Sequence, residues 1–326
     1  EAQMSEHKPQ ERAHRIAEQG RKIQAHIDEV DEKRRKAPKA KRQEPPQTGQ
    51  RDYPETLDNT HLVKPGLEKD LETAPMYEAP AYQGSEKLKD MVDSGIGRAV
   101  AVLFAREGAD VAISYLEETE DARETQRAVE AEGGRCLLLP GDVSDPAYCK
   151  DAVEKTIKEF GSLDILVNNA AFQEHAGSIT DITDEHFDRT VKTNLYGYFY
   201  LARAAVPHMK PGSSIIMTGS VTGFQGSKQL LDYSMTKGGI HAFARSLSAS
   251  LLPRGIRVNA VAPGPVWTPL NPADRPAEDV RKFGSSTPMK RAAQPEEIAP
   301  AYVFLAAPTC ASYITGELLP IIGGYD

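Results

Sequence analysis

Tyr233 and Lys237 are the residues best suited to chemistry, because a phenol and an ammonium four positions apart share one face of a helix. A free tyrosine has a pKa of about 10, too high for efficient proton exchange near neutral pH. A neighbouring cation favours the phenolate and lowers that pKa. The pair is therefore a candidate general acid/base. Taken alone, the same spacing more often marks an ordinary pair on a helix surface.

Further polar motifs fall where apolar segments end. Ser220 follows one such segment, residues 168–171 (Asn-Asn-Ala-Ala) end another, and Pro263-Gly264 end a third, while Asn194 lies within a helical stretch. Each has a plain structural interpretation as a turn residue or a buried hydrogen-bonding residue. Their shared position at the ends of predicted strands favours a single site.

Residues 93–97, with the sequence Asp-Ser-Gly-Ile-Gly, open a predicted helix. Glycines at such a point let backbone N–H groups approach a phosphate at the positive N-terminus of the helix. Two glycines also suit any tight turn, so this motif gains meaning only together with the others.

The elements that must position these residues alternate along the chain. Helices are predicted over 95–107, 119–132, 146–160, 184–208, 232–252 and 295–306, and strands over 110–115, 136–139, 164–168, 214–218, 257–262 and 318–321. This alternation predicts an α/β fold, a doubly wound and mostly parallel sheet with helices on both faces. Ligands of such sheets bind beyond the carboxyl ends of the strands.

This ordered set of motifs resembles the short-chain dehydrogenase/reductase family over about residues 86–326. The polar N-terminal extension is similar to that of bacterial members described as general-stress or YghA-like oxidoreductases. The resemblance implies a Rossmann-type fold and hydride transfer between NAD or NADP and a small carbonyl or alcohol substrate. It also implies a homotetramer or dimer, with helices 184–208 and 232–252 at the interface.

The resemblance assigns catalytic roles to Asn194, Ser220, Tyr233 and Lys237. Tyr233 would exchange the proton and Ser220 would hydrogen-bond the substrate oxygen. Lys237 would assist the phenol and bind the cofactor ribose. Asn194 would anchor a water that links Lys237 to solvent.

The resemblance likewise implies two further sets of residues. Besides Tyr233 and Lys237, those expected to bind the cofactor are Ser94, Gly95, Ile96, Gly97, Tyr115, Asp142, Val143, Asn169, Ala170, Ala171, Pro263, Gly264, Val266 and Thr268. Those expected to line the substrate pocket are Phe172, Gln173, Phe224, Gln225 and Trp267.

Several roles stay open at this stage. Asp142 either faces the adenine or caps the helix that starts near Pro146, and Arg98 either reaches a phosphate or lies on a helix surface. An acidic residue at the end of the second strand would bind the ribose of NAD, and a basic one would accept the 2′-phosphate of NADP. Residues 114–118 read Ser-Tyr-Leu-Glu-Glu, which carries neither signature, so the sequence predicts NAD or NADP without preference.

The segment before Asp93 departs from the family pattern. Only Met91 and Val92 continue an apolar strand there, the first glycine of the fingerprint is absent, and about six residues are missing between Val92 and Asp93. Residues 80–90 offer no replacement strand. Either the sequence given lacks a short segment of the molecule, or the deletion is real and leaves the central strands unpaired.

Three functions therefore compete. The first is a short-chain alcohol dehydrogenase or carbonyl reductase. The second is a nucleotide-binding or assembly protein that has lost catalysis along with its first strand. The third gives the N-terminal arm a separate role in docking a partner or in stress protection.

The chain divides into a polar arm over residues 1–85 and a globular domain over 86–326. Residues 1–80 carry 15 Lys/Arg and 16 Asp/Glu, too many charges for a substantial core. We expect a helix over about 10–36. An extended strap over about 43–85 would lie on the domain or be disordered.

Composition excludes several classes. The sequence contains no run of 18 apolar residues, the length that a membrane-spanning helix needs, and no export signal is visible. Three scattered cysteines favour a cytosolic location over a disulfide framework, and a net charge of −8 argues against nucleic acid as a partner. His175 and His186 match no metal spacing and are expected to face solvent.

Overall fold

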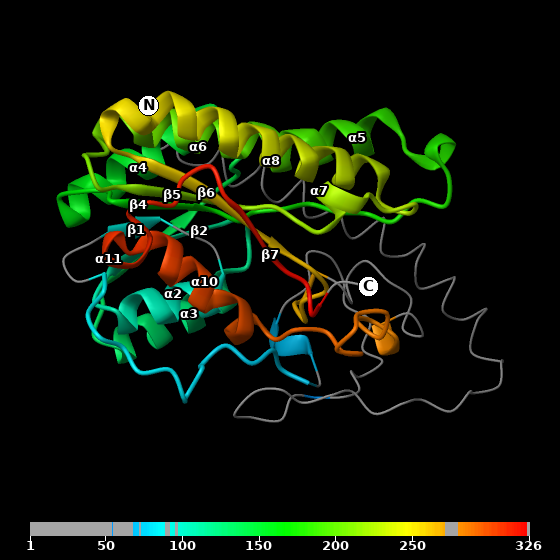
Figure 1. Cartoon of the computed structure of the whole chain (residues 1–326), viewed down its shortest axis with the longest axis horizontal. Helices are drawn as coiled ribbons and strands as arrows, with labels where there is room; N and C mark the ends of the chain where they lie inside the picture. The colour runs from blue at the N-terminus through cyan, green and yellow to red at the C-terminus, as the bar shows by residue number, and fades with distance from the viewer. Residues whose placement is uncertain are drawn as a thin grey trace.

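The computed structural model describes residues 54, 68–71, 73–88, 92–94, 97–270 and 280–324. The predicted helix over 10–36 therefore lies outside the described residues, and the boundary between arm and domain at residue 85 stays a prediction. The predicted α/β fold is confirmed. Seven parallel strands form one sheet in the order β3-β2-β1-β4-β5-β6-β7 (Figure 1).

The strands are β1 Val92–Ser94, β2 Asp110–Tyr115, β3 Cys136–Pro140, β4 Ile165–Asn168, β5 Ser214–Thr218, β6 Arg257–Pro263 and β7 Leu318–Ile321. The α-helices are α2 Arg98–Arg106, α3 Thr119–Ala131, α4 Pro146–Phe160, α5 Asp184–Val191, α6 Gly197–Ala205, α7 Thr222–Gln225, α8 Leu231–Leu251, α10 Pro295–Ala306 and α11 Pro308–Ala311. Short 3₁₀ segments are η1 Glu68–Asp70, η2 Ile179–Asp181, η4 Val206–His208 and η5 Leu252–Arg254, and η3 Lys192–Tyr196 is a π-helical turn.

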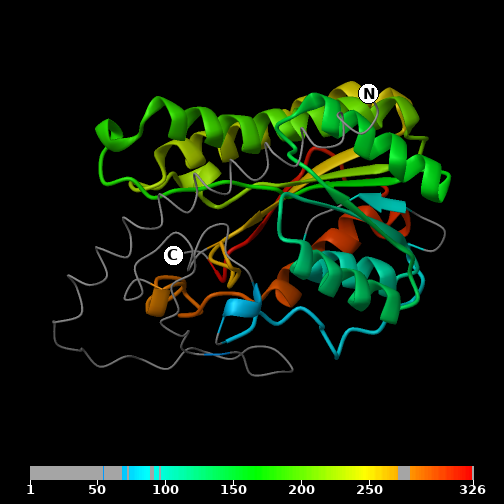
Figure 2. The same cartoon turned by 180° about the vertical axis from the view of Figure 1, so that it is seen from behind.

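Helices cover both faces of the sheet, as Figures 1 and 2 show. One apolar cluster joins α4, α6 and α8 to one face, and a second joins α2 and α10 to the other. The central strands are apolar on both faces because both are buried, and β4 is buried at every position. The carboxyl ends of the strands therefore lie between the two helical layers, at one edge of the sheet.

Local sequence explains where the elements begin and end. Asp145 caps α4 by accepting a hydrogen bond from Ala147 N, Pro146 follows in the first turn, and Gly161 ends the helix with a φ of 90°. The predicted helix 184–208 is real but is interrupted by η3, which contains Asn194. A π turn widens the helix locally and often marks a functional residue.

The alternative in which the central strands lose their partner is wrong. β1 lies at the centre of the sheet and pairs with β2 at three positions and with β4 at two. It is nevertheless short, because β2 continues through Ile113–Tyr115 and β4 through Val167–Asn168 with no β1 partner. The neighbouring strands thus keep a central partner, and the shortened part lies at the carboxyl end that faces the ligand side.

Residues 68–88, apart from residue 72, lie along the edge of the α/β body, and we call them the strap (Figures 1 and 2). Met76 N donates to Gln294 Oε1 at 3.0 Å, and Ala79 N donates to Glu296 Oε2 at 2.7 Å, which ties the strap to the start of α10. Leu88 is fully buried in the cluster of α2 and α10. The described part of the N-terminal region is therefore joined to the body by backbone hydrogen bonds and apolar contacts.

Candidate active site

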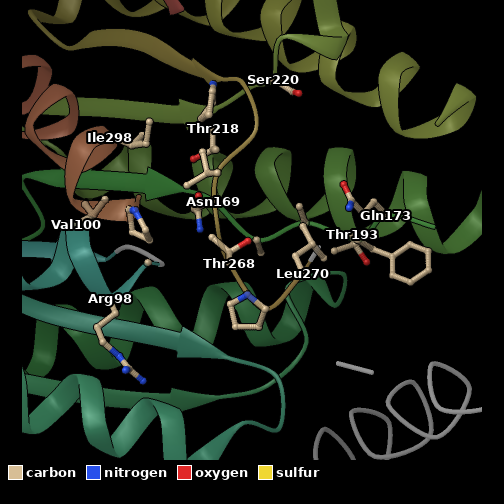
Figure 3. Close-up of a pocket in the computed structure, with 18 of the residues that line it drawn as sticks. Arg98, Val100, Asn169, Gln173, Thr193, Thr218, Ser220, Thr268, Leu270 and Ile298 are labelled. Atoms are coloured by element: carbon tan, nitrogen blue, oxygen red, sulfur yellow. The ribbon is translucent and has the colours of Figure 1, made fainter. Parts of the chain in front are cut away.

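A single cavity of about 650 Å³ lies at the carboxyl ends of the strands. Its walls come from the ends of β2, β4, β5 and β6, from α2, α8 and α10, and from the strap. Figure 3 shows Arg98 on one side of this cavity and Gln173 and Thr193 on the other, with Asn169 and Thr268 between them. Sites of this volume and position suit a nucleotide and a small substrate.

Tyr233 and Lys237 lie on α8, and both line the cavity. The Lys237 side chain is almost fully buried, with its Nζ 5.4 Å from the centroid of the Tyr233 ring and 2.8 Å from its acceptor, Thr218 O. Burial lowers the pKa of Lys237 to about 7, because no carboxylate of the described residues offsets the lost hydration of the ammonium. A ligand that accepts hydrogen bonds from Nζ would favour its charged form.

Ser220 lies just beyond β5 and lines the same cavity. Its Oγ accepts hydrogen bonds from Thr222 N at 3.1 Å and Thr222 Oγ1 at 3.0 Å. These two bonds occupy the lone pairs of Oγ and leave its proton to be donated. His241 packs behind this loop and accepts from Ser220 N at 3.4 Å. Burial, with Lys237 and Arg245 nearby, lowers the pKa of His241 to about 4, so it is neutral there.

Asn194 is fully buried and does not line the cavity. Its Oδ1 accepts from Phe172 N at 2.7 Å, and its Nδ2 donates to Phe172 O at 2.9 Å and to Thr236 Oγ1 at 3.0 Å. Thr236 Oγ1 in turn donates to Tyr233 O at 2.8 Å. Asn194 thereby joins the loop after β4 to the turn of α8 that carries Tyr233.

Most residues expected to bind the cofactor come together in this cavity. Those that line it are Gly97, Tyr115, Asp142, Val143, Asn169, Ala170, Ala171, Tyr233, Lys237, Pro263, Gly264, Val266 and Thr268, and Phe172 and Gln173 of the expected substrate pocket line it too. Gly95 and Ile96 lie outside the described residues. Ser94 ends β1, and only its backbone pairing is described.

The cavity fits a dinucleotide on its own chemistry. Gly97 precedes α2 as its N-cap residue with a φ of 125°, and within the described residues it provides no side-chain cap for the first N–H groups of that helix. These groups face the ligand side and suit a phosphate. At the other end, the buried ammonium of Lys237 suits the hydroxyl groups of a ribose.

Three expectations for the substrate pocket are corrected. Phe224 and Gln225 of α7 do not line the cavity: Phe224 is half exposed and packs on His241, with ring centroids 4.4 Å apart. Trp267 is fully buried in a small cluster with Leu71 and Phe283, and its Nε1 donates to Thr73 O at 2.9 Å. The ring of Trp267 thus contacts the strap side of its loop, while the next residue, Thr268, lines the cavity.

The structure also places the two residues whose roles the sequence left open. Asp142 lines the cavity and accepts from Ser144 N at 2.8 Å and Ser144 Oγ at 2.7 Å, whereas Asp145 caps α4. Arg98 is on the first turn of α2 and lines the cavity, but its guanidinium is already paired with carboxylates.

His186 does not face solvent as expected. Its side chain is 8% exposed, and its Nε2 lies 3.0 Å from Asp232 Oδ2, next to Thr190. The described residues hold no group of three His, Cys, Asp or Glu side chains arranged for a metal ion. No helix within the described ranges is long and apolar enough to cross a membrane.

Sequence reasoning missed the cavity residues contributed by distant segments. Glu68, Pro75 and Tyr77 come from the strap, and Ile298 and Tyr302 come from α10. The strap has no motif, so its sequence carried no signal for this contact. The apolar face of α10 was visible, but its neighbour in space was not.

Comparison with known proteins gives the same fold and a family. The family model described as enoyl-(acyl carrier protein) reductase matches residues 91–326. General stress protein 39 of Bacillus subtilis is 51% identical over 279 residues, which cover 83% of this chain and 97% of that protein. This share exceeds residues 91–326, so the similarity includes part of the N-terminal region.

Two further relatives carry cofactor names. The chloroplastic NADPH-dependent aldehyde reductase 1 of Arabidopsis thaliana is 45% identical over 274 residues, or 80% of this chain and 95% of that protein. A short-chain dehydrogenase from Burkholderia cenocepacia, solved with NADP, superposes with a TM-score of 0.68 at 31% identity and covers 73% of this chain and 98% of its own.

Proposed function

We propose that this protein interconverts a small carbonyl compound and its alcohol, with Tyr233 as general acid/base. The chain belongs to the short-chain dehydrogenase/reductase family and is therefore an NAD(P)-dependent oxidoreductase. The observation that carries the proposal is that Tyr233, Ser220 and Lys237 line the same cavity as the loops at the strand ends. Bound NAD(P) supplies or accepts the hydride.

Tyr233 and Ser220 divide the work on the substrate oxygen. In the reducing direction, Tyr233 Oη gives its proton to the oxygen that becomes the alcohol, and in the oxidising direction the phenolate takes that proton back. Ser220 donates its own proton in a hydrogen bond to the same oxygen, since its lone pairs are occupied by Thr222. The oxygen is thereby held within reach of Tyr233.

Lys237 favours ionisation of the Tyr233 phenol. Its ammonium lies 5.4 Å from the ring centroid and stabilises negative charge on the phenolate. Thr218 O fixes the position of Nζ and leaves two further N–H donors for a ribose.

Asn194 acts as a positioning residue in this proposal. Its Oδ1 and Nδ2 both bond Phe172, and Nδ2 also bonds Thr236. These hydrogen bonds favour a role in fixing the cavity wall and the Tyr233 turn over a role in anchoring a water.

The test is Tyr233→Phe, with Tyr313→Phe as a control because Tyr313 is fully exposed. We expect kcat with an aldehyde and alcohol panel to fall at least about 100-fold in Tyr233→Phe, since general acid/base catalysis is worth that much or more. Cofactor affinity should change by less than about threefold, because the phenol does not carry the main binding contacts. Retained turnover would refute the role of Tyr233.

The substrate class is a small or medium aldehyde, ketone or sugar-like alcohol. Phe172 and Leu270 offer apolar contacts in the cavity, and Gln173 and Thr193 offer hydrogen bonds. This mixture suits a carbonyl group on a chain that carries hydroxyl groups. The aldehyde reductase relative supports the same class.

Self-association is part of the proposal. Tyr196 and Phe199 are 45% and 46% exposed, and with Leu195, Tyr200 and Phe243 they form an apolar patch across η3, α6 and α8. Aromatic patches of this kind mark interfaces between subunits. Phe199→Asp should convert a dimer or tetramer into smaller species in sedimentation, and an unchanged mass would count against this interface. The cytosolic location stays a prediction.

A catalytically impaired nucleotide-binding protein is not favoured. That alternative depended on the loss of the first strand and of the first glycine of the fingerprint. β1 occupies the centre of the sheet. The relatives are named as dehydrogenases and reductases.

A further inference from the structure

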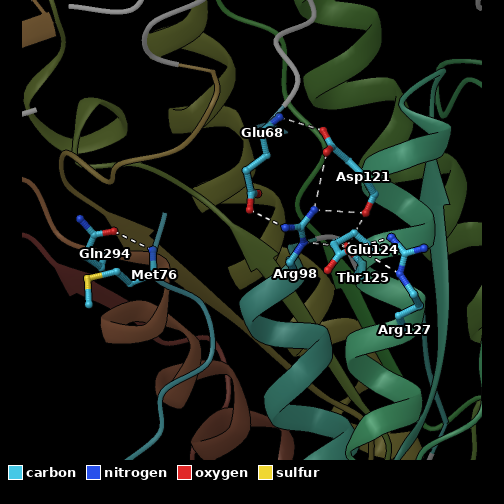
Figure 4. A network of polar contacts seen from close by, with 8 residues as sticks. All are labelled: Glu68, Met76, Arg98, Asp121, Glu124, Thr125, Arg127 and Gln294. Atoms are coloured by element: carbon cyan, nitrogen blue, oxygen red, sulfur yellow. Dashed lines mark hydrogen bonds and ion pairs between the residues drawn. The ribbon is translucent and has the colours of Figure 1, made fainter. Parts of the chain in front are cut away.

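Arg98 and Glu68 meet at one end of the cavity, although they are 30 residues apart in the chain (Figure 4). Arg98 NH1 lies 2.5 Å from Glu68 Oε1. Arg98 is on the first turn of α2, inside the domain, whereas Glu68 belongs to the strap. The N-terminal region therefore contributes a carboxylate to the cavity wall.

The other donors of Arg98 are also engaged. Its Nε donates to Thr125 Oγ1 at 3.1 Å, and its NH2 donates to Asp121 O at 3.3 Å and lies 3.7 Å from Asp121 Oδ1. The ring of Tyr77 covers the guanidinium at 4.9 Å. An anion that enters this end would reach Arg98 through the position that Glu68 now holds.

This end of the cavity is where a Rossmann-type fold distinguishes NAD from NADP. The loop after the second strand faces the adenosine ribose, where an acid binds the 2′-hydroxyl and an arginine accepts the 2′-phosphate. Here Tyr115 and Leu116 at the end of β2 line the cavity together with Arg98 and Glu68. β2 itself ends without a carboxylate, and Glu118 of the loop that follows it lines the cavity. The strap supplies a second carboxylate, Glu68, directly beside Arg98.

From this juxtaposition we infer that Glu68 is a specificity-determining residue that selects against the 2′-phosphate of NADP by occupying Arg98. Its carboxylate accepts a hydrogen bond from the 2′-hydroxyl of NAD and repels a 2′-phosphate. The inference rests on the proposed function, because it takes NAD(P) as the ligand of this cavity.

The surroundings of Glu68 favour the neutral form of its carboxyl group. Besides Arg98 on α2, the charged groups that face it are Asp121 and Glu124 on α3, and Arg127 pairs with Glu124. Burial, opposed by Arg98 and aided by the two acids, raises the pKa of Glu68 to about 7. Glu68 therefore loses its charge, and with it the repulsion of a phosphate, as the pH falls through about 7.

The experiment measures dissociation constants of NAD⁺ and NADP⁺ by calorimetry without substrate at pH 8. The variants are Glu68→Gln, Arg98→Gln, the double variant, and Asp70→Asn as a matched control. Asp70 is an exposed carboxylate two residues away on η1 that does not line the cavity.

We expect Glu68→Gln to tighten NADP⁺ binding at least about tenfold and to weaken NAD⁺ binding about two- to fivefold, because a phosphate gains the NH1 group of Arg98 that Glu68 held and a hydroxyl loses a charged acceptor. The gain for NADP⁺ should vanish in the double variant, since it requires Arg98. Asp70→Asn should keep the ratio of the two constants within about twofold.

Three outcomes would overturn the inference. The ratio could stay unchanged in Glu68→Gln, both affinities could fall in parallel as expected for a mere anchor of the strap, or the gain could persist without Arg98. If neither nucleotide binds even the wild-type protein or Asp70→Asn, the proposed function fails instead.

A second measurement covers the case in which a variant misfolds. Between pH 6 and pH 8, the wild-type affinity for NADP⁺ relative to NAD⁺ should fall about fivefold or more as Glu68 ionises. Ionisation of the 2′-phosphate, with a pKa near 6, acts in the opposite direction towards an arginine. A relative affinity that rises over this range would contradict the inference.

Discussion

Glu107 and Glu68 both lie where the strap meets the α/β body, but their carboxylates have different surroundings. Glu107 belongs to the body, at the end of α2, and is fully buried. Its two oxygens accept from Ser85 N at 2.9 Å, Lys87 N at 3.0 Å, Lys87 Nζ at 2.8 Å and Tyr82 Oη. Glu68 belongs to the strap and, among the described residues, has one cationic partner, Arg98, with two acids nearby.

The number of donors decides what each carboxylate does. Burial opposes ionisation of Glu107, yet the hydrogen bonds from Lys87, Tyr82 and the backbone hold its pKa at about 2. Burial dominates at Glu68 and raises its pKa to about 7. A buried charge with a full set of donors fixes a segment in place, whereas one with a single partner can be displaced by a competing ligand.

The largest expected effect is the loss of the Glu107 anchor. Glu107→Gln should lower the free energy of unfolding by about 3 kcal/mol, because an amide keeps one acceptor oxygen and turns its NH₂ towards other donors. Urea unfolding measures this. Glu154→Gln is the control and should change stability by less than about 0.5 kcal/mol, since Glu154 pairs with Lys150 on the exposed surface.

The stability of Glu107→Gln relative to wild type should also depend on pH below about 4.5. The folded-state pKa of Glu107 lies below its ordinary value of 4.5, so its contribution is present above pH 4.5 and is lost as the pH falls towards 2. The stability difference between wild type and Glu107→Gln should therefore shrink over that window. A difference that stays constant down to pH 2.5 would show that the hydrogen bonds do not act through the carboxylate charge.

Glu68→Gln should raise the free energy of unfolding at pH 8, whereas Glu107→Gln should lower it. The raised pKa of Glu68 gives a contribution that is complete below pH 4.5 and is lost as the pH rises through about 7. Relative to wild type, the variant should gain on the order of 2 kcal/mol between pH 4.5 and pH 8. Thermal unfolding at both pH values measures the change. A variant that is destabilised at pH 8 would show that Glu68 is an anchor like Glu107.

The smallest expected effect concerns a single donor. Tyr82→Phe removes the phenolic hydrogen bond to Glu107 and leaves the other three donors in place. A loss of about 1.5 kcal/mol is expected in urea unfolding, because hydrogen bonds to charged groups contribute this much. Tyr313→Phe, at an exposed position, should be neutral. A Tyr82→Phe loss as large as that of Glu107→Gln would mean that the phenol carries the whole anchor.

Much of the α/β body was predictable because its signals are local. Apolar runs bounded by turns predicted six of the strands, and the predicted helix over 146–160 coincides with α4, which Asp145, Pro146 and Gly161 delimit in the structure. The motifs at strand ends followed from the same alternation, since parallel strands place their carboxyl ends together.

The errors arose where the outcome depended on packing between distant segments. Trp267 follows a cavity residue in sequence, but its ring is buried against Leu71 and bonded to Thr73. His186 looked like a surface residue on α5, yet Asp232 of α8 lies 3.0 Å away. β1 is too short to be recognised from its residues, and pairing with β2 and β4 defines it.

By itself, the sequence determined the alternation of strands and helices, the spacing of Tyr233 and Lys237, and the grouping of motifs at one edge of a sheet, because periodicity and turn chemistry act over a few residues. Only the tertiary structure decided which carboxylate stands beside Arg98 and which donors surround Glu107. Those contacts join the strap to helices 20 or more residues away. No local pattern encodes them, since burial and charge act through space on whichever groups the fold brings together.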